Sequence, residues 1–191
     1  MAEATRCGFV AIIGAPNAGK STLLNRLVGA KVSIVSPKVQ TTRRRVLGIL
    51  VEGPSQIIFV DTPGIFAPNR RLDRAMVRSA WQGAEDADLI LLVVDAARPR
   101  LEEETRVIIE GLQRAGRRAI LALNKIDVVK RQKLLGLAQR LFDEGIFEAL
   151  FMISAETGDG TGDLVRDLAA RMPEGPWHYP DDQVSGSTVS A

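Results

Sequence analysis

The chain has 191 residues, of which 46% are hydrophobic and 25% are charged, and its formal net charge is +2. This balance is typical of a globular domain with a buried core, and the small charge does not by itself indicate a nucleic-acid partner. A single cysteine excludes an internal disulfide, and a single histidine, His178, excludes histidine triads and multi-histidine metal sites. Because the sequence has neither a signal-peptide pattern nor an apolar run long enough to span a bilayer, we expect a cytoplasmic protein.

Short apolar runs alternate with amphipathic stretches along the chain, which is the pattern of a parallel sheet wrapped by helices. The runs predict strands at 7–13, 46–51, 57–61, 89–95, 119–124 and 150–154. Only five residues separate the second strand from the third, too few for a crossover, so these two should form an antiparallel hairpin. Helices are expected to begin near residues 20, 69, 101, 130 and 162. The predicted fold class is α/β, with a mixed six-stranded sheet flanked by about five helices.

The stretch GAPNAGKST, residues 14–22, lies between the first strand and the first helix and fits the pattern G-x-x-x-x-G-K-[ST]. The backbone N–H groups of such a loop, and the helix N-terminus after it, bind phosphate. Lys20 can reach the β- and γ-phosphates of a nucleotide, and the Ser21 hydroxyl can ligate Mg²⁺. The alternative interpretation is a glycine-rich turn with an incidental lysine. The predicted contacts are Gly14, Ala15, Pro16, Asn17, Ala18, Gly19, Lys20 and Ser21.

The tetrapeptide DTPG follows the third predicted strand, at the carboxyl edge of the sheet where ligands bind in such folds. Asp61 can hold Mg²⁺ through water. The N–H of Gly64 can approach a γ-phosphate because glycine has no side chain in the way. In isolation DTPG also fits an ordinary turn. The predicted contacts here are Asp61, Thr62, Pro63 and Gly64.

Two further segments predict selectivity for guanine. In NKID, after the fifth strand, Asp127 can accept hydrogen bonds from the N1–H and the exocyclic amine of guanine, where adenine has no donors. The stem of Lys125 can cover the base, and Asn124 can tie this loop to the phosphate loop. SAE, after the sixth strand, would offer its alanine N–H to guanine O6, although SAE alone is a weak signal. The predicted contacts are Asn124, Lys125, Asp127, Ser154, Ala155 and Glu156.

Together these segments resemble the translation-factor-like GTPases and, more closely, the Era family of ribosome-assembly GTPases within the TrmE-Era-EngA-like superfamily. The resemblance covers about residues 7–184 and includes GxPNxGKSTLLN, QTTR, DTPG, NKID and SAETG. It implies a P-loop NTPase with a Ras-like G domain over residues 1–172, and a linker over 173–191 towards a KH domain that this chain lacks. It also implies a molecular switch that binds GTP or GDP with Mg²⁺ and hydrolyses GTP slowly during assembly of the small ribosomal subunit.

The resemblance assigns QTTR, residues 40–43, to switch I, so that Thr42 would complete the Mg²⁺ shell, with Thr41 as the alternative. Ile65 follows DTPG and cannot orient the attacking water as a glutamine does in small signalling GTPases, which leaves the water-orienting group unnamed. The implied metal ligands are Ser21, Thr42 and Asp61, and the implied catalytic residues are Asn17, Lys20, Thr42 and Gly64.

Asn17 is a candidate ligand for K⁺. Within the wider family, a phosphate-loop asparagine combined with an apolar residue after DTPG occurs in GTPases that use a potassium ion, and this sequence has both features. The neutral amide oxygen can hold a cation against the phosphates, where negative charge develops during hydrolysis. The alternative role of Asn17 is a hydrogen bond within the loop.

The partners that the resemblance implies are a guanine nucleotide and the small ribosomal subunit with its 16S rRNA, bound mainly through the KH domain. No obligate oligomer is expected, and peripheral association with the inner membrane stays open. Arginines around the switch segments, at 43, 44, 45, 70, 71, 74 and 78, would contact rRNA phosphates or form a solvated face. Trp177 and Tyr179 would pack back on the domain or anchor a following one.

The sequence leaves three alternative functions open: another RNA-modification or ribosome-assembly GTPase of the superfamily, a P-loop kinase and a binding-only GTP sensor.

Overall fold

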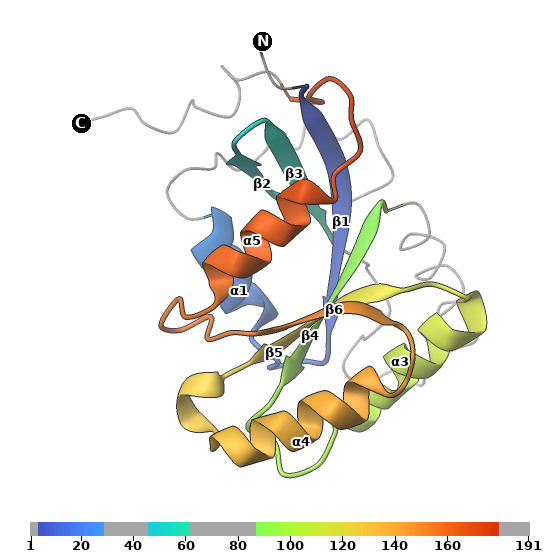
Figure 1. The fold of residues 1–191 in the computed structure, drawn as a ribbon, viewed down its shortest axis with the longest axis vertical. Helices are drawn as coiled ribbons and strands as arrows, with labels where there is room; N and C mark the ends of the chain where they lie inside the picture. The colour runs from blue at the N-terminus through green and yellow to red at the C-terminus, as the bar shows by residue number, and fades with distance from the viewer. Residues whose placement is uncertain (1–3, 29–45, 62–86, 180–191) are drawn as a thin grey trace.

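Six strands form one mixed sheet in the order β2-β3-β1-β4-β5-β6 (Figure 1). The computed structural model describes residues 4–28, 46–61 and 87–179. Neighbouring strands run parallel except β2, which pairs antiparallel with β3 and confirms the predicted hairpin. The strands are β1 (Arg6–Gly14), β2 (Val46–Glu52), β3 (Ser55–Val60), β4 (Leu89–Asp95), β5 (Ala119–Asn124) and β6 (Phe147–Met152).

The predicted bounds were wrong by two or more residues at β3 and β6. β3 begins at Ser55 because Ser55 and Gln56 are buried although polar, so they fall outside the apolar run. Ser55 Oγ donates to Ala169 O at 2.8 Å, which compensates its burial. β6 begins at Phe147, which pairs with Ala119, and the strand ends before Ile153. β6 is an edge strand and is only partly buried, so the strand includes the exposed Glu148 and does not coincide with the apolar run from which its bounds were predicted.

Helices cover both faces of the sheet, with α1 and α5 on one face and α3 and α4 on the other (Figure 1). Alternate residues of β1 show the two layers, since Ile13 packs in the cluster that includes α3 and α4, and Ile12 packs in the cluster that includes α1 and α5. The helices are α1 (Lys20–Val28), α3 (Glu103–Ala115), α4 (Arg131–Phe142) and α5 (Thr161–Ala170), with a 3₁₀ helix at Ile126–Val128. Their starts lie within two residues of the predictions, and the helix expected near residue 69 lies outside the described residues.

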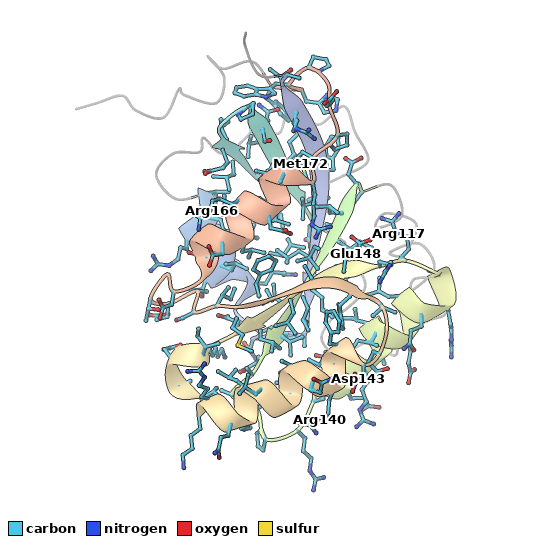
Figure 2. All side chains as sticks on the ribbon, viewed as in Figure 1. Arg117, Arg140, Asp143, Glu148, Arg166 and Met172 are labelled. Atoms are coloured by element: carbon cyan, nitrogen blue, oxygen red, sulfur yellow. The ribbon has the colours of Figure 1, made fainter. Side chains whose placement is uncertain are left out.

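The outer helices follow the expected amphipathic pattern. In α4, Leu134, Leu137 and Leu141 are buried against the sheet, while Arg140 extends away from it (Figure 2). α3 ends at Ala115 and is capped by Gly116, whose left-handed φ of 65° lets the following N–H, that of Arg117, donate to Leu112 O at 3.0 Å. No helix in the described ranges has the length and the apolar character that a bilayer crossing requires.

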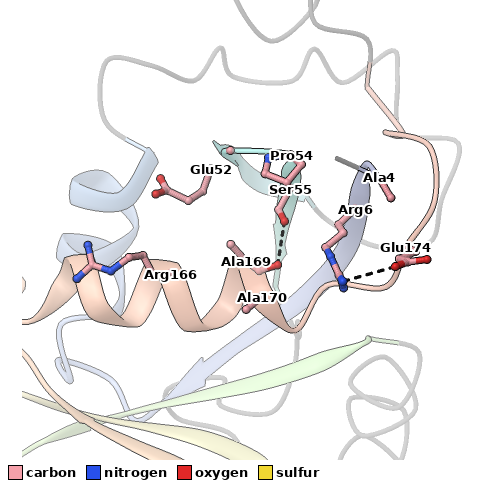
Figure 3. A pocket seen from close by; sticks show the side chains of 10 residues that line it. Ala4, Arg6, Glu52, Pro54, Ser55, Arg166, Ala169, Ala170 and Glu174 are labelled. Atoms are coloured by element: carbon pink, nitrogen blue, oxygen red, sulfur yellow. Dashed lines mark hydrogen bonds and ion pairs between the residues drawn. The ribbon is translucent and has the colours of Figure 1, made fainter. Parts of the chain in front are cut away.

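The segment after α5, residues 173–179, lies along the amino ends of β1 and β3. Cys7 N donates to Pro173 O at 3.0 Å, and Trp177 Nε1 donates to Pro54 O at 2.9 Å. Figure 3 shows the ion pair of 3.6 Å between Arg6 and Glu174 at this end of the sheet. Trp177 and Tyr179 therefore pack back on the domain, as one of the two interpretations of the sequence proposed.

Gln56 is the buried group that ties this segment to the sheet. Its side chain is fully buried; Nε2 donates to Tyr179 O at 2.8 Å, and Oε1 accepts from Tyr179 N at 3.1 Å. The Cys7 thiol also donates to Oε1, at 3.4 Å, and burial raises the pKa of that thiol. Burial likewise raises the pKa of Tyr179. One glutamine thus satisfies both main-chain groups of a residue 123 positions away.

We predict that Gln56→Leu lowers the free energy of unfolding by about 1–3 kcal/mol, because it leaves the Tyr179 N–H and C=O without their partner. Urea denaturation measures this loss. Gln132→Leu, at an exposed position of α4, is the control and should change the free energy by less than about 0.5 kcal/mol. Equal stability of the parent protein and Gln56→Leu would show that the segment does not depend on this side chain.

Candidate functional site

The predicted phosphate loop forms the turn between β1 and α1. Ala18 N donates to Ala15 O at 3.1 Å, and two residues of the turn have left-handed backbone, Asn17 with a φ of 69° and Gly19 with a φ of 97°. Asparagine adopts this conformation more readily than most other residues with a side chain. At Gly19 an added Cβ would also overlap the side-chain amide of Asn124. The turn thus requires glycine at position 19 and tolerates asparagine at position 17.

Lys20 and Ser21 are the first two residues of α1, so they lie at the positive end of the helix dipole. Asp61 follows β3, the neighbour of β1 in the sheet. Lys20 Nζ lies 3.8 Å from Asp61 Oδ1, and both side chains are partly exposed. The structure therefore brings together the ammonium predicted to bind phosphate and the carboxylate predicted to hold Mg²⁺. Thr42, Thr62, Pro63, Gly64 and Ile65 lie outside the described residues.

Asn124 is the last residue of β5, and its side chain links two loops. The Nδ2 group donates to Ala18 O in the phosphate loop at 2.9 Å, and Oδ1 accepts from Ala155 N at 2.9 Å. The residue is only 2% exposed. The tie between NKID and the phosphate loop is therefore present, and the same amide also fixes the loop of residues 154–156.

Ala155 differs from the expectation, because its N–H already donates to Asn124. A guanine O6 at this position would have to share that donor. The neighbouring Ser154 donates from Oγ to Asp127 Oδ1 at 3.0 Å, and Oγ accepts from Thr157 N at 3.1 Å. The serine thus fixes the carboxylate that is predicted to read the base.

Lys125 connects the base side of the site to the phosphate loop. Its Nζ donates to Asn17 O at 3.1 Å and to Asp95 Oδ2 at 2.8 Å. Lys125 has a φ of 73°, and Lys125 and Asn17 are the two non-glycine residues with positive φ within the described ranges. Sparsely populated backbone conformations of this kind cluster at ligand sites, where the surrounding contacts stabilise them.

Asp95 is a residue of this site that the sequence interpretation missed. It ends β4, its side chain is 4% exposed, and it accepts from Lys125 Nζ and, through Oδ1, from Ala97 N at 2.9 Å. Arg98 Nε lies 3.5 Å from Oδ2. Asp95 stands beside Asn124 in the sheet, so the rule that selected Asp61 and Asn124, a polar residue at the carboxyl end of a strand, also selects Asp95.

The donors at the phosphate end fit Mg²⁺ in type, since Ser21 supplies a hydroxyl oxygen and Asp61 a carboxylate oxygen. Within the described residues no three His, Cys, Asp or Glu side chains are grouped to hold a metal ion. The remaining oxygens of a Mg²⁺ shell would come from groups other than these two side chains.

A pocket of about 570 Å³ lies at the other end of the sheet (Figure 3). It is lined by residues from the amino ends of β1 and β3, from α5 and from the segment after it, including Arg6, Ser55, Ala169 and Glu174. None of the predicted contact residues lines it. The pocket and the predicted nucleotide site are therefore separate.

The chain is similar in sequence to a family of GTPases and to named members of it. The family described as 50S ribosome-binding GTPase matches residues 9–125. The chain is 59% identical over 188 residues to GTPase Era of Afipia carboxidovorans, which covers 98% of this chain and 61% of the relative. It is 57% identical over 194 residues to GTPase Era of Caulobacter vibrioides, covering 95% of this chain and 61% of that relative. The chain thus spans about six tenths of the length of the curated relatives it matches.

Two solved structures are similar in fold and sequence. One is a variant of Era from Aquifex aeolicus bound to GDP and AlF4-, with a TM-score of 0.70 and 39% identity. The other is Era in complex with MgGDPNP and nucleotides 1506–1542 of 16S ribosomal RNA, with a TM-score of 0.71 and 39% identity. Each match covers 93% of this chain and 61% of the other. The predicted fold class, a mixed six-stranded sheet of the Ras-like G domain type, is confirmed.

Proposed function

This chain belongs to the 50S ribosome-binding GTPase family, and from that membership we propose that it binds GTP and GDP and hydrolyses GTP slowly. The observation that carries the proposal is the double hydrogen bond of Asn124, which joins the phosphate loop to the loop of residues 154–156. A phosphate group and a base bound to these two loops would lie at a fixed separation. This is what recognition of a whole nucleotide requires.

The proposed role of Asp127 is to accept the N1–H and the exocyclic amine of guanine. Ser154 Oγ holds one carboxylate oxygen, so the carboxylate is oriented before the base arrives. Adenine presents no donor to this group, and binding it would leave the carboxylate without those hydrogen bonds. Lys125, fixed by Asp95 and Asn17 O, would cover the base with its stem.

At the phosphate end, Lys20 would balance charge on the β- and γ-phosphates, and Ser21 and Asp61 would hold Mg²⁺ directly or through water. The metal ion would neutralise charge that develops on the transferred phosphate. The lysine ammonium and Asp61 lie 3.8 Å apart, so a bound phosphate would compete with the carboxylate for the ammonium. Thr42, Thr62, Pro63 and Gly64 are proposed contacts that rest on the resemblance alone.

K⁺ is proposed as a further cofactor, with Asn17 as its protein ligand. The main-chain oxygen of Asn17 is engaged by Lys125, and the residue is exposed at the tip of the phosphate loop. We propose that the oxygen of its amide side chain contacts the ion. A neutral oxygen there can hold a monovalent cation without adding negative charge beside the phosphates.

For the wider role, we propose action in assembly of the small ribosomal subunit, with 16S rRNA as partner. The support is the similarity to Era, one structure of which contains a 16S rRNA fragment. We also propose that residues 1–172 form the G domain and that 173–191 form a connecting segment towards a KH domain, with residues 173–179 docked on the G domain.

The proposed location of the protein is the cytoplasm, and peripheral attachment to the inner membrane is a finer alternative. A binding-only GTP sensor remains the second candidate, because Ile65 cannot orient water.

The first test of this function is Asp127→Asn, which replaces two acceptor oxygens with one acceptor and one donor. Loss of a charged hydrogen bond should weaken GDP binding by about 10- to 100-fold and reduce the preference for GTP over ATP. Titration calorimetry with Mg²⁺ measures both effects, and Asp143→Asn, on the exposed end of α4, is the control. An unchanged preference for guanine would refute base reading by Asp127, and absence of single-turnover hydrolysis by the parent would favour the sensor.

The second test concerns K⁺. We expect single-turnover GTP hydrolysis to be faster in K⁺ than in Na⁺ at equal ionic strength, and Asn17→Ala to remove the difference with little change in GDP affinity. Because the φ of 69° strains alanine, Asn17→Gly is the better-matched variant, since it removes the amide and keeps the backbone conformation. Identical rates of the parent protein in the two salts would return Asn17 to a structural role.

A further inference from the structure

Arg26, in the last turn of α1, reaches the loop that follows β6. Its Nε donates to Ala155 O at 2.6 Å and its Nη2 donates to Glu156 O at 2.6 Å. These two carbonyls belong to the segment proposed to read guanine. α1 therefore contacts both ends of the site, through Lys20 and Ser21 at its start and through Arg26 near its end.

The loop is shaped to receive this guanidinium. Gly158 has a φ of 92°, and an added Cβ would lie 2.9 Å from Arg26 Nη1. Within the loop, Gly158 N donates to Ser154 O at 2.8 Å and Ser154 N donates to Asp159 O at 2.9 Å. Residues 154–159 thus form a closed turn whose carbonyls at 155 and 156 face α1.

The position of a carbonyl fixes the direction of the N–H that follows it. In a planar trans peptide the C=O and the N–H point in opposite directions, so Ala155 O bonded to Arg26 turns the Glu156 N–H away from α1. Among the described residues none accepts a hydrogen bond from this N–H. The neighbouring Ala155 N–H is engaged by Asn124. The Glu156 N–H is therefore the donor of this loop that remains for a base.

We propose that Arg26 is a positioning residue for guanine recognition, which aims the Glu156 N–H at O6 of the base by holding the Ala155 carbonyl of the same peptide, while its bond to the Glu156 carbonyl fixes the next peptide of the loop. The inference rests on the proposed guanine-nucleotide function. Arginine suits the role because its planar fork presents two donors in fixed geometry, whereas a lysine ammonium is a single flexible point charge. Arg26 would not touch the nucleotide itself.

The test compares GDP with 6-thio-GDP, in which a weakly accepting sulfur replaces O6 and the donors at N1 and N2 remain. The parent protein should prefer GDP by about three- to tenfold, the range expected for one neutral hydrogen bond. In Arg26→Met the affinity for GDP should fall by a similar factor and the affinity for 6-thio-GDP should change little, so that the preference approaches one. Arg26→Lys should give an intermediate preference.

Arg114→Met is the matched control, because Arg114 occupies the last turn of α3 as Arg26 does in α1. Thermal unfolding without nucleotide verifies that each variant is folded. If Arg26→Met retains the preference of the parent, or loses affinity for both ligands equally, the positioning role is overturned. If the parent binds no GDP at all, the proposed function fails, and this inference fails with it.

Discussion

The side-chain amide of Asn124 is the interaction on which the rest of the site depends. A buried amide must have partners for both its donor and its acceptor, and here these partners lie in two different loops, at Ala18 and Ala155. Replacement by an apolar residue would leave a carbonyl and an N–H without partners, at about 1–3 kcal/mol each. Gly19 is part of the same constraint, because any side chain there would overlap the amide.

Around this amide the site is arranged before a ligand arrives. Asn17 and Lys125 both have left-handed backbone, a cost of roughly 1–3 kcal/mol each for residues with a side chain. The hydrogen bond from Lys125 to Asn17 O and the ion pair with the buried Asp95 offset this strain. Nucleotide binding then orders these loops less, so it loses less conformational entropy and the affinity is higher.

Much of the fold was predictable from the sequence because of how its strands are buried. β4 and β5 are covered on both faces, so each is a continuous apolar run, and both bounds were correct. Ser55 and Gln56 broke the pattern because their burial depends on Ala169 O and Tyr179, far away in the sequence. Within the site, the spacing of the phosphate-loop motif was enough to select Lys20. The hydrogen bonds of the Arg26 side chain and of the Ala155 N–H could not be predicted, because each joins a side chain to main chain far away in the sequence and no local sequence pattern indicates it. Asp95 could have been found from its place at a strand end.

One bound nucleotide is expected to engage both loops that Asn124 joins. A titration of the ¹⁵N-labelled chain with Mg·GDP, followed by two-dimensional NMR, tests this directly. We expect the amide signals of residues 14–21, 124–127 and 154–157 to shift together with one affinity, while those of the Figure 3 pocket, such as Arg6 and Glu174, stay in place. Shifts confined to one of the two loops, or shifts centred on that pocket, would contradict it.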